Sequence, residues 1–154
     1  INVMGRVFMN PLDDPFDSIR KVIGDKLLGK NISAIIIDIH CEATSEKMAI
    51  GHGFDGKTSL IVGTHTHVPT SDARILSNGT AYISDLGMCG DYDSIIGMDK
   101  TKALERFKKK IPVRGINPAT GEASLSCVLV ELDDNTGLAK SITPIIVGGS
   151  LQEI

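Results

Sequence analysis

The sequence predicts an α/β protein with a mixed sheet. Strand patterns alternate with amphipathic helix patterns through the first two-thirds of the chain. The last third holds two longer strand patterns joined by a turn, which is typical of an antiparallel pair added to such a sheet. The chain has 154 residues, 42% hydrophobic and 23% charged, as in ordinary globular proteins. This length predicts one domain that covers residues 1–154.

The first two elements are a strand and a helix. A strand is expected over residues 2–9, and a loop with two prolines follows it. Asp14 is a favourable N-cap and Pro15 a favourable first helical residue. Hydrophobic residues then recur at three- and four-residue steps, which predicts an amphipathic helix as far as Leu28.

Two buried strands with a short helix between them come next. Residues 33–40 are almost continuously apolar and β-branched, which predicts a strand covered on both faces. Residues 44–53 predict a short helix, with Thr44 or Ser45 as its cap. Residues 58–64 predict a second short buried strand. This order favours two parallel strands that lie side by side.

The remaining segments predict a short hairpin, a helix and a longer hairpin. In that order they cover residues 73–84, 100–110 and 122–147. The helix should turn Ala103, Leu104 and Phe107 toward the core, and its basic end suits the negative pole of the helix dipole.

Charge and cysteine content argue against several classes of protein. A net charge of −3 gives no general attraction to a nucleic acid duplex or a membrane surface. The cysteines Cys41, Cys89 and Cys127 are odd in number and form no C-x-x-C pair, which predicts buried free thiols. No apolar run approaches the roughly 20 residues that span a bilayer, and no export signal is visible. We therefore expect a cytoplasmic protein.

Three of the four histidines follow apolar strands. His40 ends the first buried strand, and His65 and His67 come just after the second. One such histidine is more often a hydrogen-bonded structural residue, but three past neighbouring strand ends indicate convergence. Neutral imidazole suits zinc, iron and manganese. The pattern predicts a metal site made by these three residues.

Acidic residues near the histidines have less definite roles. Asp38 lies two residues before His40 and faces the same side of a regular strand. It either holds the imidazole from behind or pairs with a lysine. Glu42, Glu46 and Asp85 are nearby in the sequence, without an obvious bridging position. The fourth histidine, His52, is expected at the surface or at a helix end.

The motifs around these residues resemble a known family. "GTHTHV" at 63–68 is similar to the G-H-x-H motif of calcineurin-like metallophosphoesterases, and "HCEATSEK" at 40–47 resembles the bacterial YmdB-like phosphodiesterases. The resemblance implies an α/β/β/α sandwich that hydrolyses phosphodiester bonds of cyclic nucleotides. It also implies two divalent metal ions, iron or manganese, with zinc as an alternative. By motif, His40 and His65 would bind one ion and His67 the other.

Several motifs of that family are absent from this sequence. A strand with a metal-binding aspartate, a Gly-Glu-Asn motif and a Gly-Asn-His motif are missing, so no general-acid histidine can be assigned. The chain therefore resembles the C-terminal portion of the family, and we expect an incomplete sandwich. Either it is a fragment or split-gene product, or it is a degenerate protein.

Three functional hypotheses remain open. The first is a phosphodiesterase whose site is completed by an N-terminal segment or a partner chain; this chain alone would then be weak or inactive. The second is an inactive remnant that binds metal or a partner, and uncovered strand faces would favour a homo-oligomer. The third is a three-histidine zinc hydrolase, for which Glu42 or Asp85 would have to act as the base.

Overall fold

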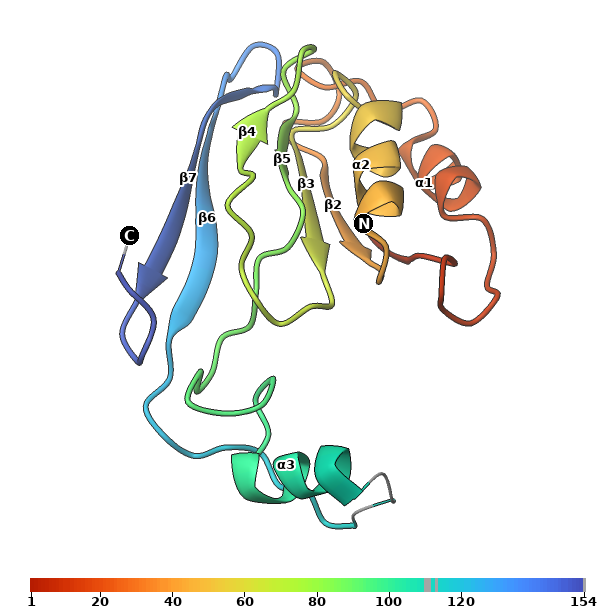
Figure 1. Ribbon diagram of the computed structural model, residues 1–154. Coiled ribbons are helices and arrows are strands. Elements are labelled where there is room, and N and C mark those ends of the chain that lie inside the picture. Colours follow the sequence, from red (N-terminus) through yellow and green to blue (C-terminus); the bar gives the residue numbers. More distant parts are fainter. Residues whose placement is uncertain (110–111, 113, 154) are drawn as a thin grey trace.

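The computed structural model describes residues 1–109, 112 and 114–153. These residues form a mixed α/β fold with a parallel sheet, as predicted (Figure 1). The elements, in chain order, are β1 (Asn2–Met4), α1 (Pro15–Ile23), β2 (Ile36–His40), α2 (Thr44–Gly53), β3 (Leu60–Thr64), β4 (Arg74–Ile75), β5 (Ala81–Ile83), α3 (Lys100–Lys109), β6 (Leu125–Leu132) and β7 (Ala139–Val147).

The described strands form two sheets. The five-stranded sheet has the order β1-β2-β3-β5-β4, in which β4 is antiparallel to β5 and all other neighbours are parallel. The second sheet is the antiparallel pair of β6 and β7. The short and the long predicted hairpins are both confirmed, because β4–β5 and β6–β7 pair as the sequence indicates.

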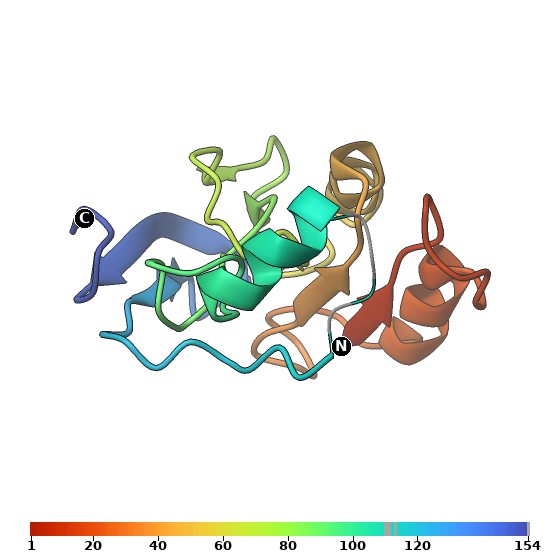
Figure 2. The ribbon, with the colours of Figure 1, turned by 60° about the horizontal axis from the view of Figure 1, so that its bottom comes forward.

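The large sheet lies between two layers. Helices α1 and α2 cover one face, and the β6–β7 hairpin lies on the other side (Figures 1 and 2). The helix side holds the larger core cluster, which includes Ile37, Ile39 and Ile61. The hairpin side holds a smaller cluster around Val62 and Ile83. Alternate residues of the central strands therefore face different layers.

Strand β2 is covered on only one face, so the prediction of two covered faces is wrong. Ile37 and Ile39 are fully buried against the helices, whereas Ile36 is 52% exposed. Asp38 and His40 also lie on this open side and are only half-buried. The hairpin lies over β3 and β5 but does not cover β2 (Figure 1). A continuous apolar run cannot reveal this difference, because β-branched residues suit either environment.

The first strand is shorter than expected because another partner takes its N–H groups. The amide of Gly5 still donates to the His40 carbonyl at 2.9 Å. The next amides, those of Arg6 and Val7, donate instead to the Glu46 carboxylate of α2. The chain leaves the sheet there, and strand pairing ends after Met4 rather than at residue 9.

Two helix boundaries also differ from the predictions. Asp14 caps α1 as expected, by accepting from the amides of Phe16 and Asp17. The helix ends at Ile23, five residues before the predicted end, because Gly24 turns the backbone to a φ of 53°. Helix α2 has Ala43 as its N-cap residue, and no side chain caps it.

Helix α3 is not packed as predicted. Ala103 is buried, but Leu104 is exposed and Phe107 is 71% exposed. Figure 1 shows α3 below the sheet and apart from helices α1 and α2, which fits the exposure of its apolar side chains. Residue 110, which the expected helix included, lies outside the described residues.

The cysteines and the helix lengths give two further outcomes. Cys41 is buried as predicted, Cys127 is half-buried, and Cys89 is exposed, so the prediction is wrong for Cys89. Within the described ranges, no helix is both long enough and apolar enough to span a membrane.

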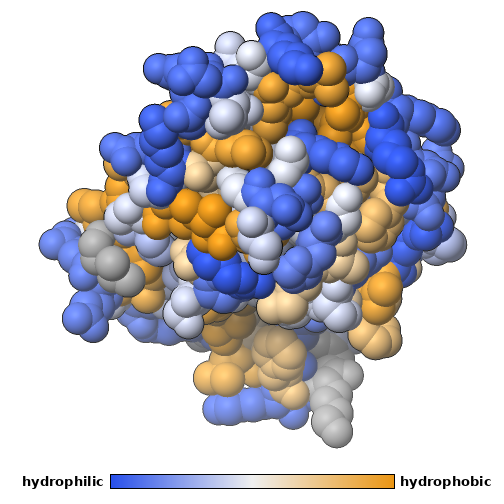
Figure 3. All heavy atoms as spheres, turned by 90° about the horizontal axis from the view of Figure 1, so that it is seen from above, coloured by the Kyte–Doolittle hydropathy of each residue, from blue (hydrophilic) through white to orange (hydrophobic). Residues whose placement is uncertain are grey.

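Figure 3, which looks down on the edge where β2 and β3 begin, shows hydrophobic patches between hydrophilic side chains.

Candidate functional site at the carboxyl ends of β2 and β3

Two of the predicted site residues, His40 and His65, meet where two parallel strands end. Strands β2 and β3 pair with His40 opposite Thr64, and His65 follows Thr64 directly. The expectation that two neighbouring parallel strands bring His40 close to the "GTHTHV" segment is therefore confirmed. This edge is where α/β sheets commonly carry their ligands.

His40 and His65 are in direct contact. His65 Nδ1 lies 3.2 Å from His40 Nε2, and the two rings meet edge to face with centroids 5.0 Å apart. The other nitrogen of His65, Nε2, lies 2.7 Å from a carboxylate oxygen of Glu42. Both rings are half-buried.

A chain of hydrogen bonds holds His40 from behind. Asn2 Nδ2 donates to Asp38 at 2.7 Å, and the Thr64 hydroxyl donates to the other Asp38 oxygen at 2.9 Å. Thr64 Oγ1 also lies 3.0 Å from His40 Nδ1. Asp38 therefore reaches His40 through Thr64, and not directly. The sequence contains Thr64 between Gly63 and His65, but a lone threonine gives no signal of this role.

These partners determine which nitrogens keep a lone pair. The hydroxyl proton of Thr64 goes to Asp38, so its oxygen accepts from His40 Nδ1–H. Likewise, the Glu42 carboxylate can only accept, so His65 donates from Nε2. In the neutral rings, His40 Nε2 and His65 Nδ1 are both left as acceptors that face each other at 3.2 Å. Such a pair is stable only with a proton or a cation between the two nitrogens.

His67 does not join this pair. Its Nδ1 lies 3.0 Å from the carbonyl oxygen of Ile96, in the loop before α3. In the part of the chain that the structure describes, no group of three or more His, Cys, Asp or Glu side chains is arranged to hold a metal ion. The fourth histidine, His52, is exposed in the last turn of α2, as expected.

A buried ion pair fixes the backbone between the two loop histidines. Lys47 Nζ of α2 lies 2.8 Å from Asp85 Oδ2, and the two side chains are only 2% and 1% exposed. The same carboxylate accepts from the amides of Thr66 and Gly87, each at 2.9 Å. Burial raises the pKa of Asp85, but the hydrogen bonds from Lys47 and from these amides outweigh it and hold the pKa below its ordinary value. Asp85 is thus a structural anchor, and a role as general base does not suit it.

Gly63 allows the sheet to close behind the site. A Cβ at this position would lie 1.7 Å from the carbonyl oxygen of Ser84 and 2.8 Å from Lys47 Cδ. Only glycine fits this close approach between β3 and the end of β5.

The donor chemistry fits part of a metal site. Two nitrogen ligands at about 2.0–2.1 Å from one ion lie roughly 2.8–3.4 Å apart at octahedral or tetrahedral angles. The 3.2 Å separation between His40 Nε2 and His65 Nδ1 falls in this range. The Glu42 carboxylate behind His65 is also a usual partner of metal-binding histidines, whereas His40 reaches a carboxylate only through Thr64. The described side chains supply two positions of such a site and not a complete ligand shell.

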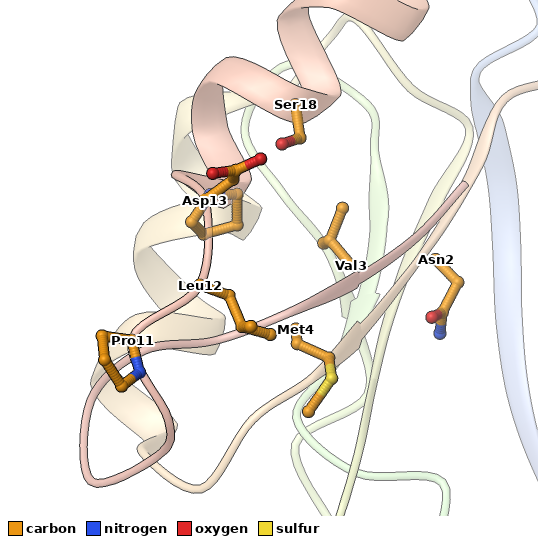
Figure 4. A pocket seen from close by; sticks show the side chains of 8 residues that line it. Asn2, Val3, Met4, Pro11, Leu12, Asp13 and Ser18 are labelled. Atoms are coloured by element: carbon orange, nitrogen blue, oxygen red, sulfur yellow. The ribbon is translucent and has the colours of Figure 1, made fainter.

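A large cavity lies away from the histidines. It measures about 630 Å³ and lies between β1, the loop at residues 11–13 and the first turn of α1. Figure 4 shows Leu12, Asp13 and Ser18 beside β1, and no histidine is among its lining residues. Asn2 lines it and also donates to Asp38, which connects the cavity to the His40 side of the sheet.

The chain is therefore an α/β protein in which two imidazoles face each other at the carboxyl edge of a parallel sheet. The comparisons with known proteins narrow this class. The family described as YmdB-like protein matches residues 1–145, and the chain belongs to this family. The resemblance found in the sequence is thereby confirmed.

Its relatives are phosphodiesterases and phosphatases. The chain is 49% identical over 147 residues to a 2',3'-cyclic-nucleotide 2'-phosphodiesterase of Bacillus subtilis, and the match covers 96% of this chain and 54% of the relative. The structure superimposes on a crystal structure of a hypothetical protein from Thermus thermophilus, with a TM-score of 0.84 and 40% identity. A crystal structure of a novel phosphatase from Mycoplasma pneumoniae gives a TM-score of 0.83 and 34% identity.

The chain spans about half the length of these proteins. The superposition covers 97% of this chain and 56% of the Thermus protein, and 96% of this chain and 52% of the Mycoplasma phosphatase.

Proposed function

We propose that this chain forms part of a metal-dependent phosphodiesterase that acts on cyclic nucleotides. The observation that carries the proposal is the contact between His40 Nε2 and His65 Nδ1 at 3.2 Å. The similarity to a 2',3'-cyclic-nucleotide 2'-phosphodiesterase supports the choice of reaction and substrate class. The facing nitrogens also lie at the strand ends where ligands of α/β sheets bind.

The site would hold divalent cations through three histidines. His40 and His65 would present their facing nitrogens to one ion, and His67 would serve a second ion through Nε2, the nitrogen that Ile96 does not occupy. We propose iron or manganese, with zinc as an alternative, because imidazole suits all three. Such ions supply a nucleophile at neutral pH and neutralise charge on the phosphoryl group.

The other residues of the site keep these ligands in place. Glu42 retains the proton of His65 on Nε2, and the Asp38–Thr64 chain retains the proton of His40 on Nδ1. The Lys47–Asp85 pair holds the amide between the two loop histidines. Fixed rings lose less freedom when a cation binds, which raises affinity.

We also propose that further ligands come from outside this chain. The match covers 54% of the Bacillus relative, which leaves room for a bridging carboxylate and a general acid in an additional segment or in a partner chain. The fold would then be one part of an α/β/β/α sandwich. The isolated chain should bind a cation but hydrolyse phosphodiesters weakly or not at all.

Metal titration of single-histidine variants tests this proposal. Mn²⁺ or Zn²⁺ binding to the purified chain would be measured by calorimetry, for the wild type and for His40→Ala and His65→Ala. Both variants should bind at least about tenfold more weakly. His52→Ala is the matched control and should bind as the wild type does, because His52 is exposed at the far end of α2. Equal binding by all four proteins would exclude the site.

Activity is the second measurement. Hydrolysis of bis-p-nitrophenyl phosphate and of a 2',3'-cyclic nucleotide would be followed with added Mn²⁺. Full turnover by the isolated chain would contradict the proposed need for further ligands. A chain that binds metal but shows no turnover, even with the remaining half of a relative added, would favour the alternative of an inactive metal-binding remnant.

A further inference from the structure

Backbone strain in this protein is concentrated at the site. Four non-glycine residues in the described part of the chain have a positive φ: Phe8 (60°), His65 (130°), His67 (65°) and Ile96 (48°). Three of these four are the two loop histidines and the residue that contacts one of them. Such backbone conformations persist only where surrounding structure enforces them, and they cluster at functional positions.

Ile96 is the least expected of these residues. A β-branched residue at positive φ is a genuine outlier, because its branched Cβ crowds the backbone there. Ile95 and Met98 exchange two backbone hydrogen bonds of 3.0 Å, so Ile96 and Gly97 are the central residues of a tight hairpin turn. Both have positive φ, as a type I′ turn requires, and such turns favour Asn-Gly.

The turn is held from several directions. The amide of Gly97 donates to Ser94 Oγ at 2.9 Å, and its carbonyl accepts from Ala119 at 2.9 Å. The side chain of Ile96 is 53% exposed, so packing of that side chain is not the main reason for the conformation. The consequence of the positive φ is instead the direction of the Ile96 carbonyl, whose oxygen lies 3.0 Å from His67 Nδ1.

We propose that Ile96 is a positioning residue: its backbone carbonyl, aimed by the strained turn, holds His67 in the Nδ1–H form and leaves Nε2 free as a ligand. A carbonyl oxygen only accepts, so the nitrogen that faces it must carry the proton. The hydrogen bond made by one ring nitrogen thus sets which nitrogen is left to bind a metal. Only the binding of a metal ion by His67 Nε2 rests on the proposed function; the position of the proton on Nδ1 does not.

The arrangement gives each of the three histidines its own outer partner. His40 is held through Thr64, His65 through Glu42, and His67 through Ile96. The first two partners are side chains within or next to the recognisable motifs. The third is a backbone atom 29 residues away from its histidine, which no motif indicates.

The tautomer of His67 can be observed directly. Long-range ¹H–¹⁵N NMR of the metal-free chain distinguishes Nδ1–H from Nε2–H, and a His67→Gln spectrum assigns the signal among the four histidines. We expect His67 in the Nδ1–H form. A His67 signal from the Nε2–H form in the wild type overturns the proposal, whatever any variant shows.

Two substitutions at one exposed position test the cause. Ile96→Asn suits the positive φ and should keep the Nδ1–H form, whereas Ile96→Pro fixes φ near about −65° and turns the carbonyl away. The proline variant should lose the Nδ1–H form and bind Mn²⁺ about 10- to 100-fold more weakly, the usual effect of removing an outer partner. An unchanged tautomer in a folded proline variant overturns the proposal.

The two proposals fail in different ways. A wild-type chain that shows the Nδ1–H form but binds no cation removes the proposed function and keeps the positioning role. If the proline variant does not fold, the wild-type spectrum still tests the proposal, because a His67 signal from the Nε2–H form overturns it.

Discussion

Replacing Lys47 by methionine should cost about 3–5 kcal/mol of the free energy of unfolding. Methionine keeps an unbranched apolar side chain in the space of the lysine stem, so the change removes mainly the ammonium group. That group lies 2.8 Å from Asp85 Oδ2, and both side chains are almost fully buried. Removing one partner of a buried pair leaves an uncompensated charge, and this is the origin of the expected loss. A domain whose total stability lies at the low end of the usual range, about 5 kcal/mol, would remain folded only marginally.

The two partners should not be equivalent. Without Lys47, the Asp85 carboxylate still accepts from the amides of Thr66 and Gly87. In Asp85→Asn, the ammonium loses its charged partner, and an NH₂ group that can only donate replaces one of the two oxygens that accept from the backbone amides. Asp85→Asn should therefore be at least as destabilising as Lys47→Met. The double variant should lose less than the sum of the two, by about 0.5–3 kcal/mol, because the residues are in contact.

Urea unfolding followed by circular dichroism measures these values. Lys140→Met is the matched control, because Lys140 pairs with Asp133 at 3.0 Å on the exposed surface and its loss should leave the midpoint unchanged. A loss below about 1 kcal/mol in Lys47→Met, or strict additivity in the double variant, would refute the view that this pair is a dry, mutually dependent anchor.

Three further outcomes are expected. In a thiol-labelling experiment followed by mass spectrometry, exposed Cys89 should react first, and buried Cys41 should react only after unfolding. Burial and the nearby Glu46 charge raise the pKa of the Cys41 thiol to about 11, so little of the reactive thiolate is present. Burial raises the pKa of Asp72, but its hydrogen bonds outweigh this and lower the pKa to about 2. The Asp72 carboxylate should thus contribute its full stabilisation above pH 3.8, the ordinary pKa, and lose it as the pH falls toward 2. In a plot of the urea midpoint against pH, Asp72→Asn should remove the fall between these two pH values. Finally, Gly63→Ala should abolish folding or cost more than about 4 kcal/mol, whereas Gly90→Ala, whose Cβ meets nothing closer than 4.0 Å, should be tolerated.

Much of the architecture follows from local patterns. Alternation and turn residues place the strands and the two hairpins, and Asp14 with Pro15 marks the start of α1. The boundaries fail where a distant group competes with local preference. The Glu46 carboxylate takes amides that would have extended β1, a contact made 40 residues away along the chain.

For the histidines of the predicted metal site, the sequence likewise indicates position but not orientation. The positions of His40, His65 and His67 after apolar strands indicate their shared edge, because parallel strands end together. Their separate orientations do not follow from spacing. A positive φ at both loop histidines turns His65 toward His40 and His67 toward Ile96, and metal binding by these three residues stays a prediction.

The sequence by itself therefore determined the α/β class, the succession of strands and helices along the chain, and the histidines that gather at one edge, because periodicity and residue type act locally. Only the tertiary structure decided that the hairpin leaves one face of β2 open, that Lys47 and Asp85 form the buried anchor, and that Ile96 holds His67. These features depend on contacts between segments that are tens of residues apart in the sequence. A local pattern does not show which distant donor or acceptor will pair with a given group.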